Sequence, residues 1–197
     1  MPEILEVQMT YFFDSAFKEL MYWEGGGKFH QIPGDAGGAT KYGISLRFIK
    51  NLPLDESDIN HDGHVTDSDI ESLNEATAKA FYRKHFWLHY QLGNIEQEQV
   101  ATKILSIYVN MRGRVAGRVV QRALASCRID DVKEDGYVGP LTQSAINEIT
   151  CDLSLTAMFL AALRAQQESI YRLIVANNPS QRKFLNGWLR RARDKRA

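Results

Sequence analysis

The chain of 197 residues contains only two cysteines, Cys127 and Cys151, and only five prolines. Two cysteines are too few for the disulfide framework of a small secreted scaffold, and no metal-binding spacing connects them. We therefore expect both to be buried, reduced thiols. The chain is long enough to bury a hydrophobic core, so it does not depend on covalent cross-links for stability.

Long apolar runs and an excess of charge are also missing. No apolar segment approaches the roughly 20 residues that a membrane-spanning helix needs. The first thirty residues lack a basic region followed by an apolar run and a cleavage site, so we expect no signal peptide. Basic and acidic residues number 24 each, which gives a formal net charge of +0. A neutral chain is not expected to bind nucleic acid through its overall field.

Glycine is concentrated in residues 21–45, which read MYWEGGGKFHQIPGDAGGATKYGIS. Apolar side chains at helical spacing precede this stretch, including Phe13, Phe17 and Leu20, and predict a helix that ends near its start. We expect residues 25–27 to end that helix, because glycine accepts the left-handed backbone of a helix C-cap. The later glycines would let the returning backbone pass close to a bulky substrate.

Three polar residues of this stretch have chemistry suited to catalysis: Glu24, Asp35 and Thr40. Two carboxyl groups with a hydroxyl that can hold water are a minimal set for hydrolysis of a glycosidic bond. A structural explanation stands beside this one. A glutamate before glycines is commonly a solvated residue at a helix end, and an aspartate after Pro-Gly is commonly a turn residue. From residue types alone, that explanation is the more frequent one.

The pattern E-G-G followed by D-x-G-G-x-T-x-x-G-I resembles the signature of glycoside hydrolase family 108, the lysozyme-like N-acetylmuramidases of phages and bacteria. In this chain it consists of Glu24-Gly25-Gly26 and then residues 35–44. The gap between the two halves is about two residues longer than in typical members. The combined pattern is specific, whereas neither half alone would be.

The resemblance implies a catalytic arrangement for these residues. Glu24 matches the catalytic acid of the family, and Asp35 and Thr40 match the Asp and Thr of the Glu-Asp-Thr arrangement of phage-type lysozymes. The implied reaction is hydrolysis of the β-1,4 bond between N-acetylmuramic acid and N-acetylglucosamine. Tyr42 and Asn110 are expected to contact the substrate. For Asn110 the alternative stays open that its amide satisfies buried backbone groups.

Other segments extend the resemblance over most of the chain. Residues 78–87 resemble the family's A-x-x-I-Y-x-x-x-Y-W stretch, and residues 133–142 contain its D-G-x-x-G-P-x-T element. The element D-x-x-V-N-x-x-G is also present, but Ser106 replaces its leading aspartate. The resemblance implies an all-α, lysozyme-like (phage-type) fold. We expect a catalytic region over residues 1–126 and a peptidoglycan-binding-like helical region, packed on it, over residues 127–197.

Apolar periodicity predicts the helices that would build this fold. Beyond the first helix, they are expected over residues 44–52, 70–90, 100–111, 115–125 and 156–174, and Gly139-Pro140 predicts the start of another.

The stretch from Asp58 to Asp69 fits the twelve-position calcium loop of an EF-hand, with Gly63 at the sharp turn in position six. Aspartate in position twelve, in place of the usual glutamate, resembles the loops of dockerin-like modules. The alternative is a polar linker with accidental spacing. We expect one stabilising Ca²⁺ ion. Its predicted ligands are Asp58, Asn60, Asp62, His64 through its carbonyl, Thr66 and Asp69.

The expected partner is bacterial peptidoglycan, and the chain is expected to be a monomer. Without an export signal it would be made in the cytoplasm and reach the periplasm or cell wall through a holin pore or a secretion system. The basic segment 182–196 is either a solvated helix face or a surface attracted to anionic polymers. The competing function is a non-catalytic, calcium-dependent wall-binding module in which Glu24 is idle.

Overall fold

The computed structural model describes residues 2–31, 38–111 and 113–194, with side chains from Tyr11 onward. Its contacts divide the chain into two compact units. One, the terminal unit, consists of residues 1–16 and 86–197, and the other, the central unit, consists of residues 17–85. The first helix, α1 (Pro2–Trp23), contributes to both units. The expected division after residue 126 stays a prediction.

The central unit contains the glycine-rich stretch and the predicted calcium loop. A hairpin of β1 (Thr40–Lys41) and β2 (Ile44–Ser45) pairs Thr40 with Ser45 and Lys41 with Ile44. Both turn residues, Tyr42 and Gly43, have positive φ, at 52° and 75°, as a tight two-residue hairpin turn requires. The hairpin is followed by α2 (Leu46–Ile49), α3 (Leu54–Ser57), α4 (Asp67–Ser72) and α5 (Glu75–Tyr82).

Two predicted helices of this unit are shorter than expected. The helix expected over residues 44–52 starts only at Leu46, because Ser45 is an N-cap whose hydroxyl accepts a hydrogen bond from the Phe48 amide. The helix expected over residues 70–90 is interrupted after α4. Asn74 and Thr77 form a reciprocal capping box that starts α5. A π-helical turn, η1 (Arg83–Leu88), then follows α5.

The core of the central unit is formed by apolar residues from the helices and the hairpin. Ile49 and Ile70 are completely buried, and Phe17 packs against Tyr82 with ring centroids 6.1 Å apart. This packing fixes the C-terminal end of α1 beside α5, so the residues that follow α1 emerge from a buried framework.

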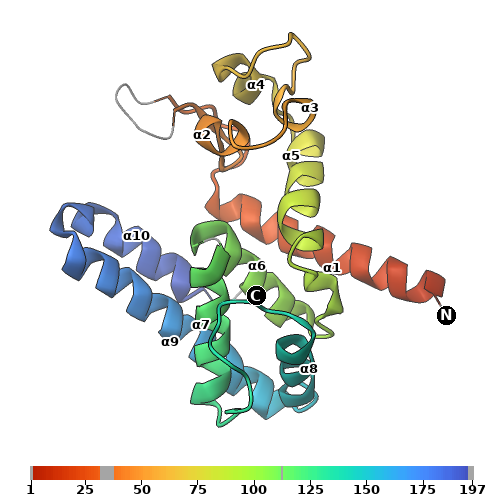
Figure 1. Ribbon diagram of the computed structural model, residues 1–197, viewed down its shortest axis with the longest axis vertical. Helices are drawn as coiled ribbons and strands as arrows, with labels where there is room; N and C mark the ends of the chain where they lie inside the picture. The colour runs from red at the N-terminus through yellow and green to blue at the C-terminus, as the bar shows by residue number, and fades with distance from the viewer. Residues whose placement is uncertain (1, 32–37, 112, 195–197) are drawn as a thin grey trace. The chain divides into compact units, whose positions relative to one another are not determined.

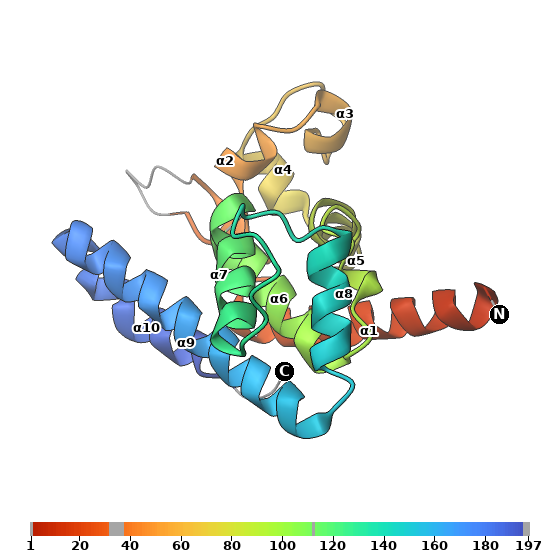
Figure 2. The same ribbon diagram turned by 60° about the horizontal axis from the view of Figure 1, so that its bottom comes forward.

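The terminal unit is a helical bundle. Its longest helix, α9 (Leu153–Asn177), packs against α7 (Gly113–Ser126) and against α10 (Arg182–Ala192), which runs back along it (Figures 1 and 2). The other helices are η2 (Leu92–Asn94), α6 (Glu98–Met111), α8 (Pro140–Ile149) and η3 (Pro179–Gln181). Completely buried residues such as Ile104, Val120 and Phe159 form its core.

These elements confirm the predicted all-α, lysozyme-like fold, with one small β-hairpin in the described part of the chain. The helices predicted over 100–111 and 115–125 are present, and α8 starts with Pro140 after the cap Gly139. Neither cysteine forms a disulfide, but only Cys127 is buried; Cys151 is exposed, contrary to expectation. No described helix is long and apolar enough to span a membrane.

Candidate functional site

Glu24 follows the last residue of α1 and is half-buried. Its amide still donates to the Leu20 carbonyl at 3.0 Å, as in the helix. Gly25 and Gly26 then take left-handed conformations, with φ of 72° and 60°, and the Gly26 amide donates to the Met21 carbonyl at 3.2 Å. These glycines end the helix as predicted, and the glutamate is attached to a fixed helix end.

The turn of the hairpin lies directly against the Glu24 carboxyl group. A methyl group placed on Gly43 would be 2.7 Å from Cδ of Glu24 and 2.7 Å from the hydroxyl of Tyr82, distances that real contacts do not reach. The carboxyl group, the turn and the Tyr82 hydroxyl therefore meet at one point. Two features require glycine at position 43: its positive φ of 75° and this close approach of neighbouring atoms.

Tyr82 is the residue of this site that sequence reasoning missed. Its ring is buried, and its hydroxyl donates a 2.9 Å hydrogen bond to the Tyr42 carbonyl in the hairpin turn. It thereby holds the turn that contacts Glu24. A signal was present in the sequence, because Tyr82 matches the first tyrosine of the family pattern that residues 78–87 resemble. Its role, however, depends on a contact with residues forty positions away.

Tyr42 and Thr40 lie on the same hairpin. The Tyr42 amide donates to the Gly26 carbonyl at 3.2 Å, and a methyl group on Gly27 would be 2.6 Å from the Tyr42 hydroxyl, so this side chain covers Gly27. Thr40 is half-buried, and its amide and carbonyl are both bonded to His30 at 2.8 Å. The structure thus ties the hairpin to the segment after Glu24.

The third predicted catalytic residue, Asp35, lies outside the described residues. Gln31 precedes the segment that contains Asp35, and Ala39 follows it. Both are bound by the carboxylate of Asp67 at the start of α4. One carboxylate oxygen of Asp67 accepts from Nε2 of Gln31 at 2.6 Å, and the other accepts from the Ala39 amide at 3.4 Å. The carboxylate therefore connects both ends of the segment that carries Asp35 to the helix that leaves the predicted calcium loop.

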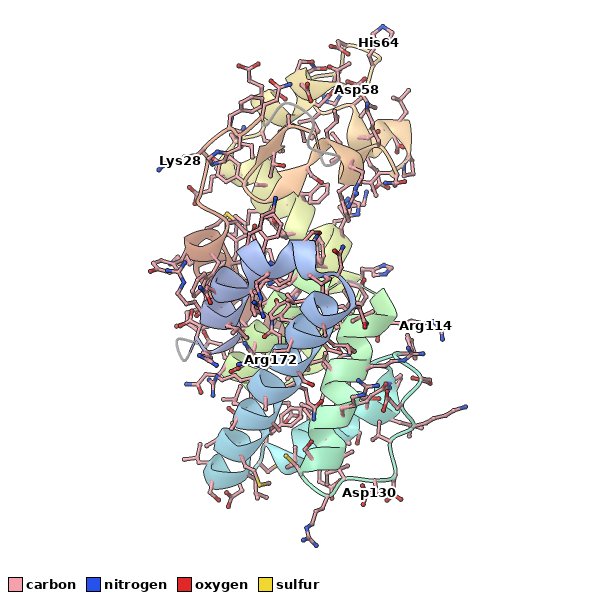
Figure 3. All side chains as sticks on the ribbon, turned by 90° about the vertical axis from the view of Figure 1, so that its left-hand side faces the viewer. Lys28, Asp58, His64, Arg114, Asp130 and Arg172 are labelled. Carbon is pink, nitrogen blue, oxygen red and sulfur yellow. The ribbon has the colours of Figure 1, made fainter. Side chains whose placement is uncertain are left out.

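The predicted calcium loop has the turn that its sequence indicates. Gly63 has φ of 85°, and the Asp58 carboxylate accepts hydrogen bonds from the amides of Asp62 at 3.0 Å and Gly63 at 2.8 Å. The Asp62 carboxylate accepts from the His64 amide at 2.9 Å. Figure 3 shows Asp58 and His64 on this loop. These bonds preform the loop and leave further lone pairs on each carboxylate oxygen.

Asp69, the expected ligand in position twelve, stabilises the backbone of this loop through hydrogen bonds. It is completely buried, and its two oxygens accept from the amides of Ile59 and Thr66, each at 2.7 Å. Thr66 in turn is the N-cap of α4 and completes a capping box with Asp69. Within the described residues, no three His, Cys, Asp or Glu side chains are grouped closely enough to hold a metal ion.

Asn110 lies near the end of α6 in the terminal unit, and its amide nitrogen donates to the Ser106 carbonyl one turn earlier at 2.9 Å. This bond agrees with the alternative that the sequence left open, in which the Asn110 amide satisfies a backbone group. A contact between Asn110 and substrate stays a prediction.

The D-G-x-x-G-P-x-T element forms a tightly held loop in the terminal unit. Gln121 of α7 donates to the Asp135 carboxylate at 2.9 Å and to the Tyr137 carbonyl at 3.0 Å, and it accepts from the Gly136 amide at 2.7 Å. The hydrogen bond from Gln121 and another from the Tyr137 amide lower the pKa of the Asp135 carboxyl below its usual value. Three hydrogen bonds of this one glutamine therefore help to fix the loop to α7.

Comparison with known proteins gives two matches that follow one another along the chain. Residues 17–112 match the family model of glycosyl hydrolase 108, and residues 115–193 match a model described as a predicted peptidoglycan domain. The first includes Glu24, the hairpin and Tyr82, and the second includes the Asp135–Gly136 loop. Together they support a glycoside hydrolase whose partner is peptidoglycan.

Among solved structures, the chain is similar to SagA of Brucella abortus. The TM-score is 0.59 at 19% sequence identity, and the alignment covers 94% of this chain and 98% of SagA. At this identity the similarity shows the fold alone. No curated protein matches the chain.

Proposed function

We propose that the chain is an N-acetylmuramidase that cleaves the β-1,4 bond between N-acetylmuramic acid and N-acetylglucosamine in peptidoglycan. The observation that carries this proposal is the position of Glu24. Its carboxyl group projects from a fixed helix end onto the turn glycine of the hairpin, beside the Tyr82 hydroxyl, within the region that matches glycosyl hydrolase 108. A general acid needs such a fixed position relative to the bond that it protonates.

In the proposed mechanism, Glu24 donates its proton to the glycosidic oxygen as the bond to the sugar breaks. Asp35 stabilises the oxocarbenium-like transition state or activates the attacking water, and Thr40 positions that water. Tyr42, whose carbonyl is held by Tyr82, provides a sugar contact at the hairpin turn. The contribution of Tyr82 is to keep the turn against the Glu24 carboxyl group.

The test replaces Glu24 by Gln, which keeps the shape of the side chain but removes the transferable proton. We expect loss of turbidity clearing on purified sacculi, with an unchanged circular dichroism spectrum and melting temperature. Glu71→Gln is the control, because Glu71 is an exposed glutamate of the same unit. Clearing by the Glu24 variant at the normal rate would remove this residue from the mechanism.

The competing proposal is a non-catalytic wall-binding module, which the match over residues 115–193 also accommodates. Such a module would sediment with sacculi without releasing soluble fragments. Turbidity and fragment release therefore separate the two proposals in one experiment.

Calcium binding by residues 58–69 is a second part of the proposal. The donor set fits in part: Asp58, Asn60 and Asp62 have the spacing and the preformed turn, whereas Asp69 already accepts bonds from loop amides. Asp58, Asn60, Asp62, His64 through its carbonyl, Thr66 and Asp69 would hold the ion. An ion there would stabilise α4, whose Asp67 binds both sides of the segment carrying Asp35.

Calcium that binds the folded protein must raise its stability, by about 2.7 kcal/mol at a concentration 100 times the Kd. We expect a higher melting temperature in calcium than in chelator, and no such difference in an Asp58→Asn, Asp62→Asn variant. A melting curve that is the same in calcium and in chelator would exclude the site.

The proposed place of action is the periplasm or the cell wall, reached by release through a holin pore or a secretion system. Peptidoglycan lies outside the cytoplasmic membrane, so a cytoplasmic pool would be harmless until release. We expect cells producing the chain to lyse only when a pore is produced with it. Lysis without a pore would contradict this route.

A further inference from the structure

The terminal unit contains a cavity of about 330 Å³ at the start of α7. It is bounded by the residues after η1, by α6, by the first turn of α7 and by the Asp135–Gly136 loop, and none of the proposed catalytic residues lines it. The cavity lies where the segment matching glycosyl hydrolase 108 ends and the one matching the peptidoglycan domain begins. Its size suits one or two residues of a peptide rather than a single small ion.

One wall of the cavity is aromatic. Tyr90 and Tyr108 are stacked, with ring centroids 3.7 Å apart and planes inclined by 20°. Tyr108 is buried, which raises the pKa of its phenol, and the neighbouring Tyr90 raises this pKa further. Tyr108 is therefore neutral at physiological pH, and the two stacked rings offer flat apolar surface together with hydroxyl groups.

The charge of the cavity is positive. Arg114 lines it and is exposed, and its guanidinium donates to the Asp135 carbonyl at 3.3 Å. Figure 3 shows this side chain extending outward from the start of α7. Among the described residues, no carboxylate is within ion-pair distance of Arg114, and no acidic side chain lines the cavity. A ligand with a carboxylate would complete the bidentate pairing that a guanidinium favours.

The cavity lining also includes an exposed aromatic residue on a rigid support. The Tyr137 side chain is 65% exposed, although the loop that carries it is fixed by the three Gln121 hydrogen bonds. A methyl group on Gly117 would lie 2.5 Å from the carbonyl carbon of Gly136, so the loop is also packed directly on α7. An exposed tyrosine on a fixed backbone loses little entropy when it covers a ligand.

We infer that this cavity binds the peptide stem of peptidoglycan, with Arg114 holding a stem carboxylate and Tyr90 and Tyr137 covering the stem's carbon chain. The inference rests on the proposed function and adds the part of the substrate that is recognised. The glycan strand is a poor match for the positive cavity, because its N-acetyl sugars are neutral and the lactyl carboxyl is consumed in the amide bond to the peptide. The free carboxylates of the polymer are on the stem.

The test measures binding by isothermal titration with the full chain carrying Glu24→Gln, which prevents turnover. The two ligands are a purified disaccharide–tetrapeptide with free stem carboxylates and the same disaccharide with a simple amide on its lactyl carboxyl in place of the peptide, so that this second ligand carries no carboxylate. We expect Arg114→Gln to weaken binding of the peptide-bearing ligand by about tenfold or more, and Tyr137→Ala by several-fold. Binding of the peptide-free disaccharide should not change.

Arg118→Gln is the matched control, since Arg118 is an exposed arginine one turn further along α7 that does not line the cavity. It removes the same charge and should change binding less than twofold. Equal effects of the Arg114 and Arg118 substitutions, or equal binding of both ligands, would overturn the inference. The readout is independent of catalysis, so an active Glu24→Gln enzyme would defeat the proposed mechanism without altering this result.

Discussion

The hairpin turn in the central unit and the Asp135–Gly136 loop in the terminal unit both depend on glycine, but for different purposes. Gly43 makes room for a side chain, the carboxyl group of Glu24, whereas Gly117 makes room for backbone, the carbonyl of Gly136. The first arrangement positions a reactive group. The second produces a rigid wall that carries an exposed tyrosine. The proposed catalytic site and the proposed recognition site thus use the same residue type for two kinds of close approach.

The largest effect is expected from Gly43→Ala. The new methyl group would collide with the Glu24 carboxyl and the Tyr82 hydroxyl, and φ of 75° adds backbone strain of about 1–2 kcal/mol. We expect the rate of sacculus clearing to fall by about a hundredfold or more, as for a misplaced catalytic group.

Gly25→Ala shows how much of the effect of Gly43→Ala is caused by backbone strain rather than by steric collision. Gly25 has a similar φ of 72°, but nothing lies within 4 Å of its added methyl group. We expect Gly25→Ala to be destabilised in thermal melts by the backbone strain alone, less than Gly43→Ala, with most of the clearing activity retained. If both alanine variants lost activity to the same degree, the contact between Gly43 and Glu24 would have no special role.

The corresponding change in the terminal unit, Gly117→Ala, should act on stability and recognition instead of on chemistry. Overpacking against the Gly136 backbone is expected to cost about 1–3 kcal/mol. A lower melting temperature and weaker binding of the peptide-bearing ligand should result, with hydrolysis of short glycans less affected. Gly187→Ala in α10 is the control, because its added methyl group meets nothing within 4 Å and alanine favours a helix. Its melting temperature should stay the same or rise.

The smallest of these effects is expected from Tyr82→Phe. It keeps the buried ring and removes only the hydroxyl that donates to the Tyr42 carbonyl, a loss of about 1 kcal/mol. We expect kcat to fall by about tenfold because the turn beside Glu24 is less firmly held, while KM changes little. Tyr22→Phe removes the hydroxyl of an exposed tyrosine on α1 and should leave kcat unchanged. A full-rate Tyr82→Phe enzyme would show that this hydroxyl is not needed.

The sequence predicts the elements whose causes are local. The end of α1 at its glycines, the start of α8 at Gly139-Pro140, and the turn at Gly63 each follow from the conformational preferences of a few adjacent residues, and each is present. The resemblance to glycoside hydrolase family 108 implied the all-α fold, and apolar periodicity indicated α6, α7 and α9 within it.

The features that the sequence did not predict arise where two local patterns compete for the same residues, or where residues distant in the sequence come into contact. The break after α4 arises because Asn74 and Thr77 cap a new helix, although the apolar periodicity continues through them. Asp69 fits a calcium ligand by its spacing, yet it caps backbone amides in the fold. Tyr82 joins the site only because α5 packs beside the hairpin, and spacing along the chain gives no information about that contact.

The most direct test of the central claim is analysis of the sugar ends released from purified peptidoglycan. After digestion, the products are reduced with borohydride and the reduced sugar is identified by mass spectrometry. A muramidase with Glu24 as its acid predicts reduced N-acetylmuramic acid from the unmodified chain and none from Glu24→Gln. Reduced N-acetylglucosamine as the product, or reduced N-acetylmuramic acid from both proteins in equal amounts, would contradict the account.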